Sequence, residues 1–233
     1  MKTVAVLQSN YLPWKGYFDI IHDVDLFVFY DDVQYTRRDW RNRNKIYSKQ
    51  GLSWLTLPCS SDFKQNICEV KINNEFGWPL KHWNQIKSAY SKAPFFKKYQ
   101  PFFEQVYFEQ KWEYLSGLNQ FLIKYIAATF FKIDTEFANS NDYSLTGKGS
   151  ERLLSLLLSI GCDEYVSGPA AKSYLDETAF QENGIRIIWK DYSGYPEYPQ
   201  MRLPFENNVS IIDLLMNTGE EAPNYIWGWR ECD

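Results

Sequence analysis

The chain has 233 residues, 45% of them hydrophobic, which is enough to bury a sizeable core in one large domain or in one domain with an insertion. Its formal net charge of −4 argues against a general nucleic-acid binder, because such proteins carry an excess of basic residues. We find neither an apolar run long enough to span a bilayer nor a signal-peptide core, so we expect a cytoplasmic protein. The cysteines lack metal-ligand spacing, and we interpret all four as free thiols: Cys59, Cys68, Cys162 and Cys232.

The first forty residues predict one strand–helix–strand unit. Residues 4–7 and 26–30 are short apolar runs, and a proline-containing loop and a helix-sized segment separate them. Such units form parallel sheets, and ligands of open α/β sheets bind beyond the carboxyl ends of the strands. We therefore expect the functional site at that edge of the sheet. Six side chains are predicted to lie there: Gln8, Asn10, Tyr11, Trp14, Asp31 and Asp32.

A cationic segment follows the second strand, with five basic residues between positions 37 and 45. A run of charge is usually a solvated loop, but this one leaves the sheet at the edge where a ligand is expected. Arginine forks match phosphate oxygens well, and an interleaved Trp40 can stack on a ring. We predict phosphate binding by Arg38, Arg41 and Arg43, with Trp40 as a wall of the site.

Residues 53–58 and 67–72 alternate in polarity and predict a small antiparallel strand pair, joined by a turn over residues 60–66. Helical patterns then follow one another without a strand, over residues 80–91, 95–100 and 112–131. We interpret residues 77–131 as a helical insertion within a single α/β domain of residues 1–233. His82 lies in the first of these helices. A lone histidine is most often a packing residue, but by elimination His82 is the first candidate for a general base.

The strand–helix rhythm returns in the second half of the chain. We predict strands over residues 135–140, 164–169 and 185–189, and a helix over 150–158 that ends at Gly161. Ser167 and Gly168 form a tight turn whose amides we expect to hold an anion, with Tyr174 close by. Ser210 and Asp213 have the spacing of a capping box before a helix over 211–217. The predicted fold is α/β, an open and mostly parallel sheet flanked by helices, with a helical insertion and a small antiparallel strand pair.

Several of these blocks together resemble the WbqC-like family of bacterial proteins, which is found with genes for O-antigen and other surface polysaccharides. The resemblance covers most of the chain, in residues 8–18, 31–35 with 40–43, 89–96, 165–168 with 174–175, and 209–219. It implies a protein that modifies a nucleotide-linked sugar in the synthesis of lipopolysaccharide. Our leading interpretation is N-acyl or aminoacyl transfer to an amino sugar. Neither the residues nor the resemblance identifies a cofactor or the donor, or decides whether the chain forms a homodimer.

Such a transfer needs a base for the substrate ammonium and donors for the tetrahedral oxyanion. Asp31, Asp32 and His82 are the candidate bases, and Gln8, Asn10 and the amides of residues 167–168 are the candidate donors. Two alternatives stay open. The two adjacent carboxylates also suit a metal-dependent glycosyltransferase, in which they would hold a divalent ion on a diphosphate. The chain can also be a non-catalytic protein that binds a sugar nucleotide as part of a scaffold.

Overall fold

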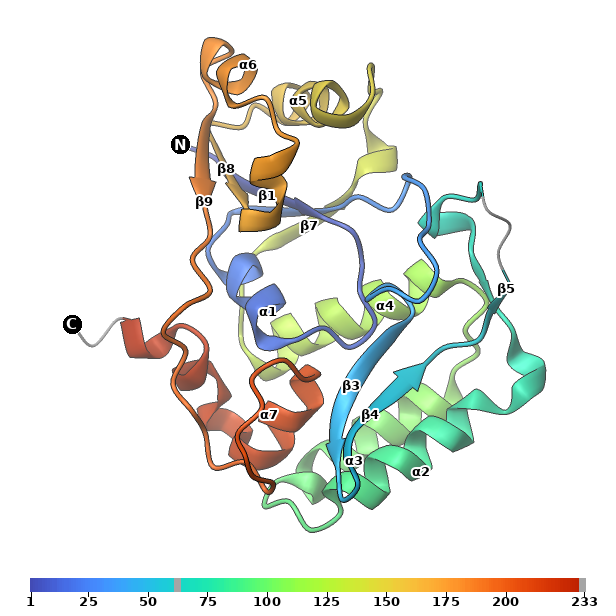
Figure 1. The fold of residues 1–233 in the computed structure, drawn as a ribbon. Helices are drawn as coiled ribbons and strands as arrows, with labels where there is room; N and C mark the ends of the chain where they lie inside the picture. The colour runs from blue at the N-terminus through green and yellow to red at the C-terminus, as the bar shows by residue number, and fades with distance from the viewer. Residues whose placement is uncertain (61–63, 231–233) are drawn as a thin grey trace.

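A sheet of five parallel strands forms the centre of the computed structural model, which describes residues 1–60 and 64–230 (Figure 1). The strands are β1 (Thr3–Leu7), β2 (Leu26–Phe29), β7 (Glu136–Asn139), β8 (Glu164–Ser167) and β9 (Arg186–Trp189), in the order β7-β2-β1-β8-β9. Every neighbouring pair is parallel. The expected open α/β sheet is thus confirmed, with the first strand of the chain at its centre.

Helices cover both faces of this sheet because the side chains of its strands alternate between them. Val4 and Val28 pack with α5 and α6 on one face, whereas Ala5 and Phe27 belong to the larger core around α1, α4 and α7 on the other (Figure 1). The seven α-helices are α1 (Lys15–His22), α2 (Trp78–Tyr90), α3 (Phe96–Glu104), α4 (Leu115–Tyr125), α5 (Gly149–Ile160), α6 (Glu177–Glu182) and α7 (Ile211–Thr218). The 3₁₀ turns are η1 (Ile67–Glu69), η2 (Asn74–Phe76), η5 (Ser140–Asp142), η6 (Pro169–Ser173), η7 (Gly219–Tyr225) and η8 (Gly228–Arg230), and the π turns are η3 (Gln105–Glu109) and η4 (Ile126–Phe130).

The strand order creates a crevice at a defined place. From β1 the chain moves outward to β2 and β7, and it then returns to the other side of β1 to form β8 and β9. In open α/β sheets the ligand crevice lies at such a reversal, beyond the carboxyl ends of the two strands that flank it. Here those strands are β1 and β8, which are followed by Gln8 and Gly168.

The antiparallel pairing differs from the sequence prediction. β3 (Arg43–Ser48) pairs with β4 (Gly51–Thr56), so residues 43–45 of the cationic segment are in a strand and not in a loop. The predicted strands 53–58 and 67–72 do not pair with each other. β6 (Lys71–Ile72) pairs instead with β5 (Cys59–Ser60), just after the first of them, and the predicted turn includes residues 61–63, which lie outside the described residues. A second strand is available nearby in sequence, so β4 pairs with β3 through a short turn and not with the distant segment.

The helical prediction agrees with the structure for α2, α3 and α4, which occupy the residues assigned to the insertion. Gly161 ends α5 in the left-handed region at φ 72°, as predicted. The capping box at α7 is incomplete. The Ser210 hydroxyl accepts the Ile212 N–H at 3.3 Å, but the Asp213 carboxylate is buried and accepts hydrogen bonds from other side chains. Its donors are Tyr90 (2.8 Å), Tyr198 (2.8 Å), Gln200 (2.7 Å) and Asn217 (3.3 Å).

No helix among the described residues combines the length and the apolar character that crossing a membrane requires.

Candidate functional site

The loop that leaves β1 is held from three directions. Tyr11 donates its N–H to the Trp40 carbonyl at 2.9 Å, and the Asn44 amide donates to the Leu12 carbonyl at 2.7 Å. The Pro13 carbonyl accepts the Ile211 N–H at 2.8 Å, which ties the loop to the start of α7. The loop is therefore fixed at the carboxyl edge of the sheet, with the side chains of Gln8 and Asn10 left partly exposed.

Asp31 is a buried carboxylate at this edge. It is 3% exposed, and it accepts the Ser9 N–H at 2.8 Å and the Gln120 side-chain amide at 2.9 Å. Burial raises the pKa of Asp31 above its ordinary value, although these hydrogen bonds and the Arg41 charge act in the opposite direction. A carboxylate whose pKa is raised by desolvation is well suited to accept a proton from a substrate.

Asp32 points to a different set of partners from its neighbour. Its carboxylate accepts the Ser140 hydroxyl at 2.5 Å and forms an ion pair with Arg152 at 2.5 Å. The two adjacent carboxylates therefore do not converge on one point, as ligands of a shared metal ion must. Among residues 1–60 and 64–230 there is also no group of three or more His, Cys, Asp or Glu side chains placed to hold a metal ion.

His82 and Tyr11 lie in the core and not in the crevice. His82 is 1% exposed, and its ring nitrogens face the Tyr11 hydroxyl (Nδ1, 2.9 Å) and the Thr56 carbonyl (Nε2, 3.1 Å). The Tyr11 hydroxyl also contacts that of Tyr107 at 2.7 Å. Burial lowers the pKa of His82 to about 4, so the ring is neutral near pH 7. This geometry fits the packing interpretation of His82 and gives no support to its prediction as a base, nor to that of Tyr11 as a wall.

A pocket of about 380 Å³ lies beside the loop after β1. Trp14 and Trp40, both predicted as walls, line it together with Asn10. The remaining lining residues are Pro13, Asn44, Lys45 and Asn208. The structure thus brings together three of the predicted substrate-binding residues, and it adds a strand of the hairpin and the segment before α7.

The indole of Trp14 is closely packed. Its ring meets Tyr192 and Tyr195 edge-on, with centroid distances of 5.3 and 5.9 Å. A side chain at Gly16 would collide with it, because an added Cβ would lie 2.3 Å from the Trp14 ring. The glycine at position 16 is therefore what lets Trp14 fold back over α1 and form a wall of the pocket.

The three arginines predicted to bind phosphate have different surroundings. Arg38 is exposed, with a backbone φ of 55°. Arg41 forms an ion pair with Asp39. Burial raises the pKa of Tyr174 and of Asp31, and the Arg41 charge opposes that rise in both. Arg43 projects from β3 and places its guanidinium 4.2 Å from the centroid of the Trp54 ring. Phosphate binding by these residues stays a prediction, and the structure separates Arg43 from the other two.

The turn after β8 contributes less than predicted. The Ser167 hydroxyl is buried and donates to the Tyr165 hydroxyl at 3.2 Å, on the face of the sheet that carries α5. The following helix, η6, is a five-residue 3₁₀ turn whose first residue is proline, so it offers few free amides to an anion. Gly168 adjoins the Tyr192 hydroxyl, 3.6 Å from where a Cβ would be, and Tyr174 is exposed. Gly168 and Tyr174 are therefore at the edge of the crevice, whereas the Ser167 hydroxyl is not.

Helix α4 supplies two site residues that sequence reasoning missed. Gln120 donates to Asp31, and the neighbouring Asn119 is fully buried and donates to the Arg41 carbonyl at 2.8 Å. The available signal was an Asn-Gln pair inside an otherwise apolar helical pattern, because buried amides require partners. Lys45, Tyr192 and Asn208 were missed as well.

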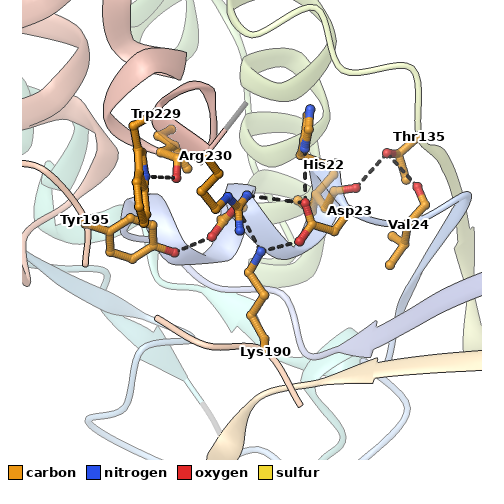
Figure 2. Close-up of polar contacts among 11 residues, drawn as sticks. His22, Asp23, Val24, Thr135, Lys190, Tyr195, Trp229 and Arg230 are labelled. Atoms are coloured by element: carbon orange, nitrogen blue, oxygen red, sulfur yellow. Dashed lines mark hydrogen bonds and ion pairs between the residues drawn. The ribbon is translucent and has the colours of Figure 1, made fainter. Parts of the chain in front are cut away.

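A cluster of charges beneath the irregular segment 190–210 holds that segment on α1 (Figure 2). Asp19 is fully buried and is paired with Lys190 at 3.0 Å and with Arg230 at 2.5 Å, and it accepts the Tyr195 hydroxyl at 2.5 Å. Lys190 and Arg230 also reach Asp23 at the end of α1. Because Tyr195 packs on Trp14, this cluster supports one wall of the pocket from behind.

Lys15 is a second buried cation near the pocket. Its ammonium lies 4.7 Å from the Tyr195 ring, 5.5 Å from Tyr198 and 5.9 Å from Phe205. Burial lowers the pKa of Lys15 to about 8, although Asp19 acts to raise it. The ring contacts indicate that Lys15 helps to hold the irregular segment against α1.

Comparison with known proteins agrees with the resemblance seen in the sequence. The family model described as the WbqC-like protein family matches residues 8–225. The chain belongs to the WbqC-like protein family. The match includes the loop after β1, the hairpin, α4 and the segment that carries Asn208. Among relatives of this WbqC-like chain is "Uncharacterized protein Rv1507c" of Mycobacterium tuberculosis (strain ATCC 25618 / H37Rv), 46% identical over 228 residues, which are 97% of this chain and 98% of that protein. No solved structure gives a significant match.

Proposed function

We propose that this protein modifies a nucleotide-linked amino sugar for surface polysaccharide synthesis, by transferring an acyl or aminoacyl group to the sugar nitrogen. The chain belongs to the WbqC-like family. The gene setting that this resemblance implies, among genes for O-antigen and other surface polysaccharides, supports the pathway. The observation that carries the proposed chemistry is the Asp31 carboxylate, which is buried at the carboxyl edge of the sheet and has a raised pKa. We place the reaction in the cytoplasm, where nucleotide sugars are made.

The reaction begins with a proton transfer. Asp31 takes a proton from the substrate ammonium, and the freed nitrogen lone pair attacks the carbonyl carbon of an activated acyl donor. A C–N bond forms, the tetrahedral intermediate collapses, and the bond between the acyl carbon and its carrier breaks with the electron pair on the carrier. The carrier takes the second proton that the nitrogen loses, and Asp31 then releases the first proton to solvent. The side-chain amides of Gln8 and Asn10, in the loop after β1, are the candidates to stabilise the oxyanion.

Asp31 fits this role better than the other predicted bases. Asp32 is already neutralised by Arg152, and both ring nitrogens of His82 are used inside the core. The divergence of the two carboxylates gives a metal-dependent glycosyltransferase no geometric support. The Ser9 N–H and the Gln120 side-chain amide restrain the orientation of the Asp31 carboxylate. Neither donor is charged, so Asp31 is not neutralised by a direct ion pair and stays available to accept a proton.

The test is Asp31→Asn, assayed by mass spectrometry for acylated product from UDP-, dTDP- and GDP-linked amino sugars with thioester and aminoacyl donors. Loss of a positioned base predicts a fall in kcat of about 10²–10⁴-fold. Asn keeps the acceptor for the Ser9 N–H, and the Gln120 amide can turn to match it, so the fold is retained. Asp213→Asn, which changes a buried carboxylate bonded to α2 and α7, is the matched control and should keep the wild-type kcat. Undiminished turnover in Asp31→Asn would refute the proposal.

A further inference from the structure

Two cations on the outer face of the β3–β4 hairpin have no acidic partner among residues 1–60 and 64–230. Arg43 and Lys45 alternate with the buried Asn44 along β3, so both project away from the core. Within the part of the chain that the structure describes, neither side chain forms a hydrogen bond or an ion pair. Each instead lies against the Trp54 ring, at 4.2 Å for the Arg43 guanidinium and 5.3 Å for the Lys45 ammonium.

Three other basic side chains around the crevice are paired with acids. Arg41 is paired with Asp39, Arg152 with Asp32, and Lys190 with Asp19. The Nε atom of Arg43 is in addition buried without an acceptor, as is that of Arg41. A buried N–H without an acceptor costs free energy, and two neighbouring cations repel each other unless an anion lies between them. Both features indicate an anionic ligand whose oxygen atoms bind here.

An exposed aromatic surface adjoins these cations. Trp40 and Trp54 are 43% and 39% exposed, and their ring centroids are 5.7 Å apart. Trp40 and Lys45 line the same 380 Å³ pocket. A nucleobase can stack on an exposed indole ring while neighbouring cations neutralise the phosphates of the same nucleotide. Because every base has a flat aromatic face, such stacking accepts different bases.

The opposite wall of the pocket leads to the proposed base. Asn10 lines the pocket, and the preceding residue, Ser9, donates its N–H to Asp31. A ligand anchored at the hairpin therefore lies beside the loop whose backbone binds the Asp31 carboxylate. The volume of the pocket falls within the range of about 300–1,000 Å³ that is typical of small-molecule sites.

We infer that this pocket binds the nucleoside diphosphate half of the substrate, with Arg43 and Lys45 on the diphosphate and Trp40 against the base. The sugar is then directed past Asn10 toward Asp31. This inference rests on the proposed function and adds to it the part of the protein that recognises the nucleotide. Lys45, which sequence reasoning missed, becomes a specificity-determining residue for the diphosphate.

The experiment measures binding of UDP, dTDP, GDP, uridine and inorganic pyrophosphate to the full chain by calorimetry and tryptophan fluorescence. We expect at least one nucleoside diphosphate to bind more tightly than either uridine or pyrophosphate, because each of these keeps only half of the contacts. Arg43→Gln, Lys45→Gln and Trp40→Leu should each raise its Kd by about tenfold or more. Lys49→Gln, an exposed lysine at the turn of the same hairpin, is the matched control and should leave Kd unchanged.

The inference is overturned if no nucleoside diphosphate binds, if uridine binds as tightly as UDP, or if the Arg43 and Lys45 variants bind as tightly as Lys49→Gln. It fails separately from the proposed function. If Arg43→Gln and Lys45→Gln turn over a nucleotide-linked amino sugar with an unchanged KM, the diphosphate site is refuted. The proposed acyl transfer is not affected by that result. The opposite outcome is also possible to distinguish. If diphosphate binding depends on Arg43 and Lys45 but Asp31→Asn keeps full turnover, the results support this site and refute Asp31 as the base.

Discussion

Replacing Gly16 with alanine tests whether the close packing of Trp14 on α1 is essential to the pocket. An added Cβ would lie 2.3 Å from one carbon of the Trp14 ring and 2.6 Å from another, well inside contact distance. The ring cannot easily move away, because Tyr192 and Tyr195 pack against it at centroid distances of 5.3 and 5.9 Å. Overpacking of this kind costs about 1–3 kcal/mol.

Gly117→Ala is the matched control, since Gly117 is also helical and an added Cβ there meets no atom within 4 Å. Alanine favours the helix over glycine by about 1 kcal/mol at both positions, so the difference between the two variants isolates the collision. For a chain of this size 1 kcal/mol changes Tm by about 2–4 °C, and Gly16→Ala should therefore melt about 2–12 °C below Gly117→Ala.

Differential scanning calorimetry gives the Tm values, and tryptophan fluorescence reports whether the Trp14 environment has changed. We also expect weaker nucleoside diphosphate binding in Gly16→Ala, because the displaced indole alters the pocket wall. If the two alanine variants melt at the same temperature and bind the ligand equally well, Trp14 is not held by Gly16 in the way described, and the reasoning is refuted.

Two further predictions concern buried ionisable groups. The pKa of His82 falls from 6.5 to about 4 on folding, so the unfolded chain protonates its imidazole more readily than the folded chain does. The free energy of unfolding should therefore drop by about 3 kcal/mol between pH 6.5 and 4. His82→Gln removes this titration and should flatten the pH dependence of the free energy of unfolding. Parallel pH profiles for the two proteins would contradict the assignment. Lys190→Met removes a buried partner of Asp19 and Asp23 and should lower the free energy of unfolding in urea by about 3–5 kcal/mol. Lys49→Met, at an exposed position, is the control and should change that free energy little. Equal urea midpoints for the two variants would show that Arg230 alone neutralises the cluster.

The centre of the sheet, β1 and β2, was predictable because the buried residues of these strands are apolar. β2 is buried at all four positions and reads as a continuous apolar run, as expected for a strand covered on both faces. The hairpin was not predictable by the same rule. Its inner face includes Asn44, whose amide bonds the loop after β1, and its outer face carries Arg43 and Lys45. Because residues on both faces of the start of β3 are polar or charged, this stretch lacks the alternation of apolar and polar residues that identifies a strand.

The site was predictable only in part, for a related reason. Residues that follow the strands directly, such as Asn10, Trp14 and Asp31, could be assigned from the position of the strands alone. Gln120 and Asn208 reach the same place from a helix and from an irregular segment that are distant in sequence. His82 shows the opposite error, since elimination selected a residue that only three-dimensional packing places in the core.

The central position of β1 sets an order for assembly on the ribosome. β1 is made first and can pair with β2 almost at once, but its other partner, β8, begins only at Glu164. Roughly 150 residues must be synthesised in between, which takes about 8–30 s at bacterial rates of translation. During that time one side of an apolar strand presents unpaired backbone groups, a template for pairing with other chains. Nascent chains of this protein should therefore depend on chaperones that cover this strand until the second half of the sheet arrives.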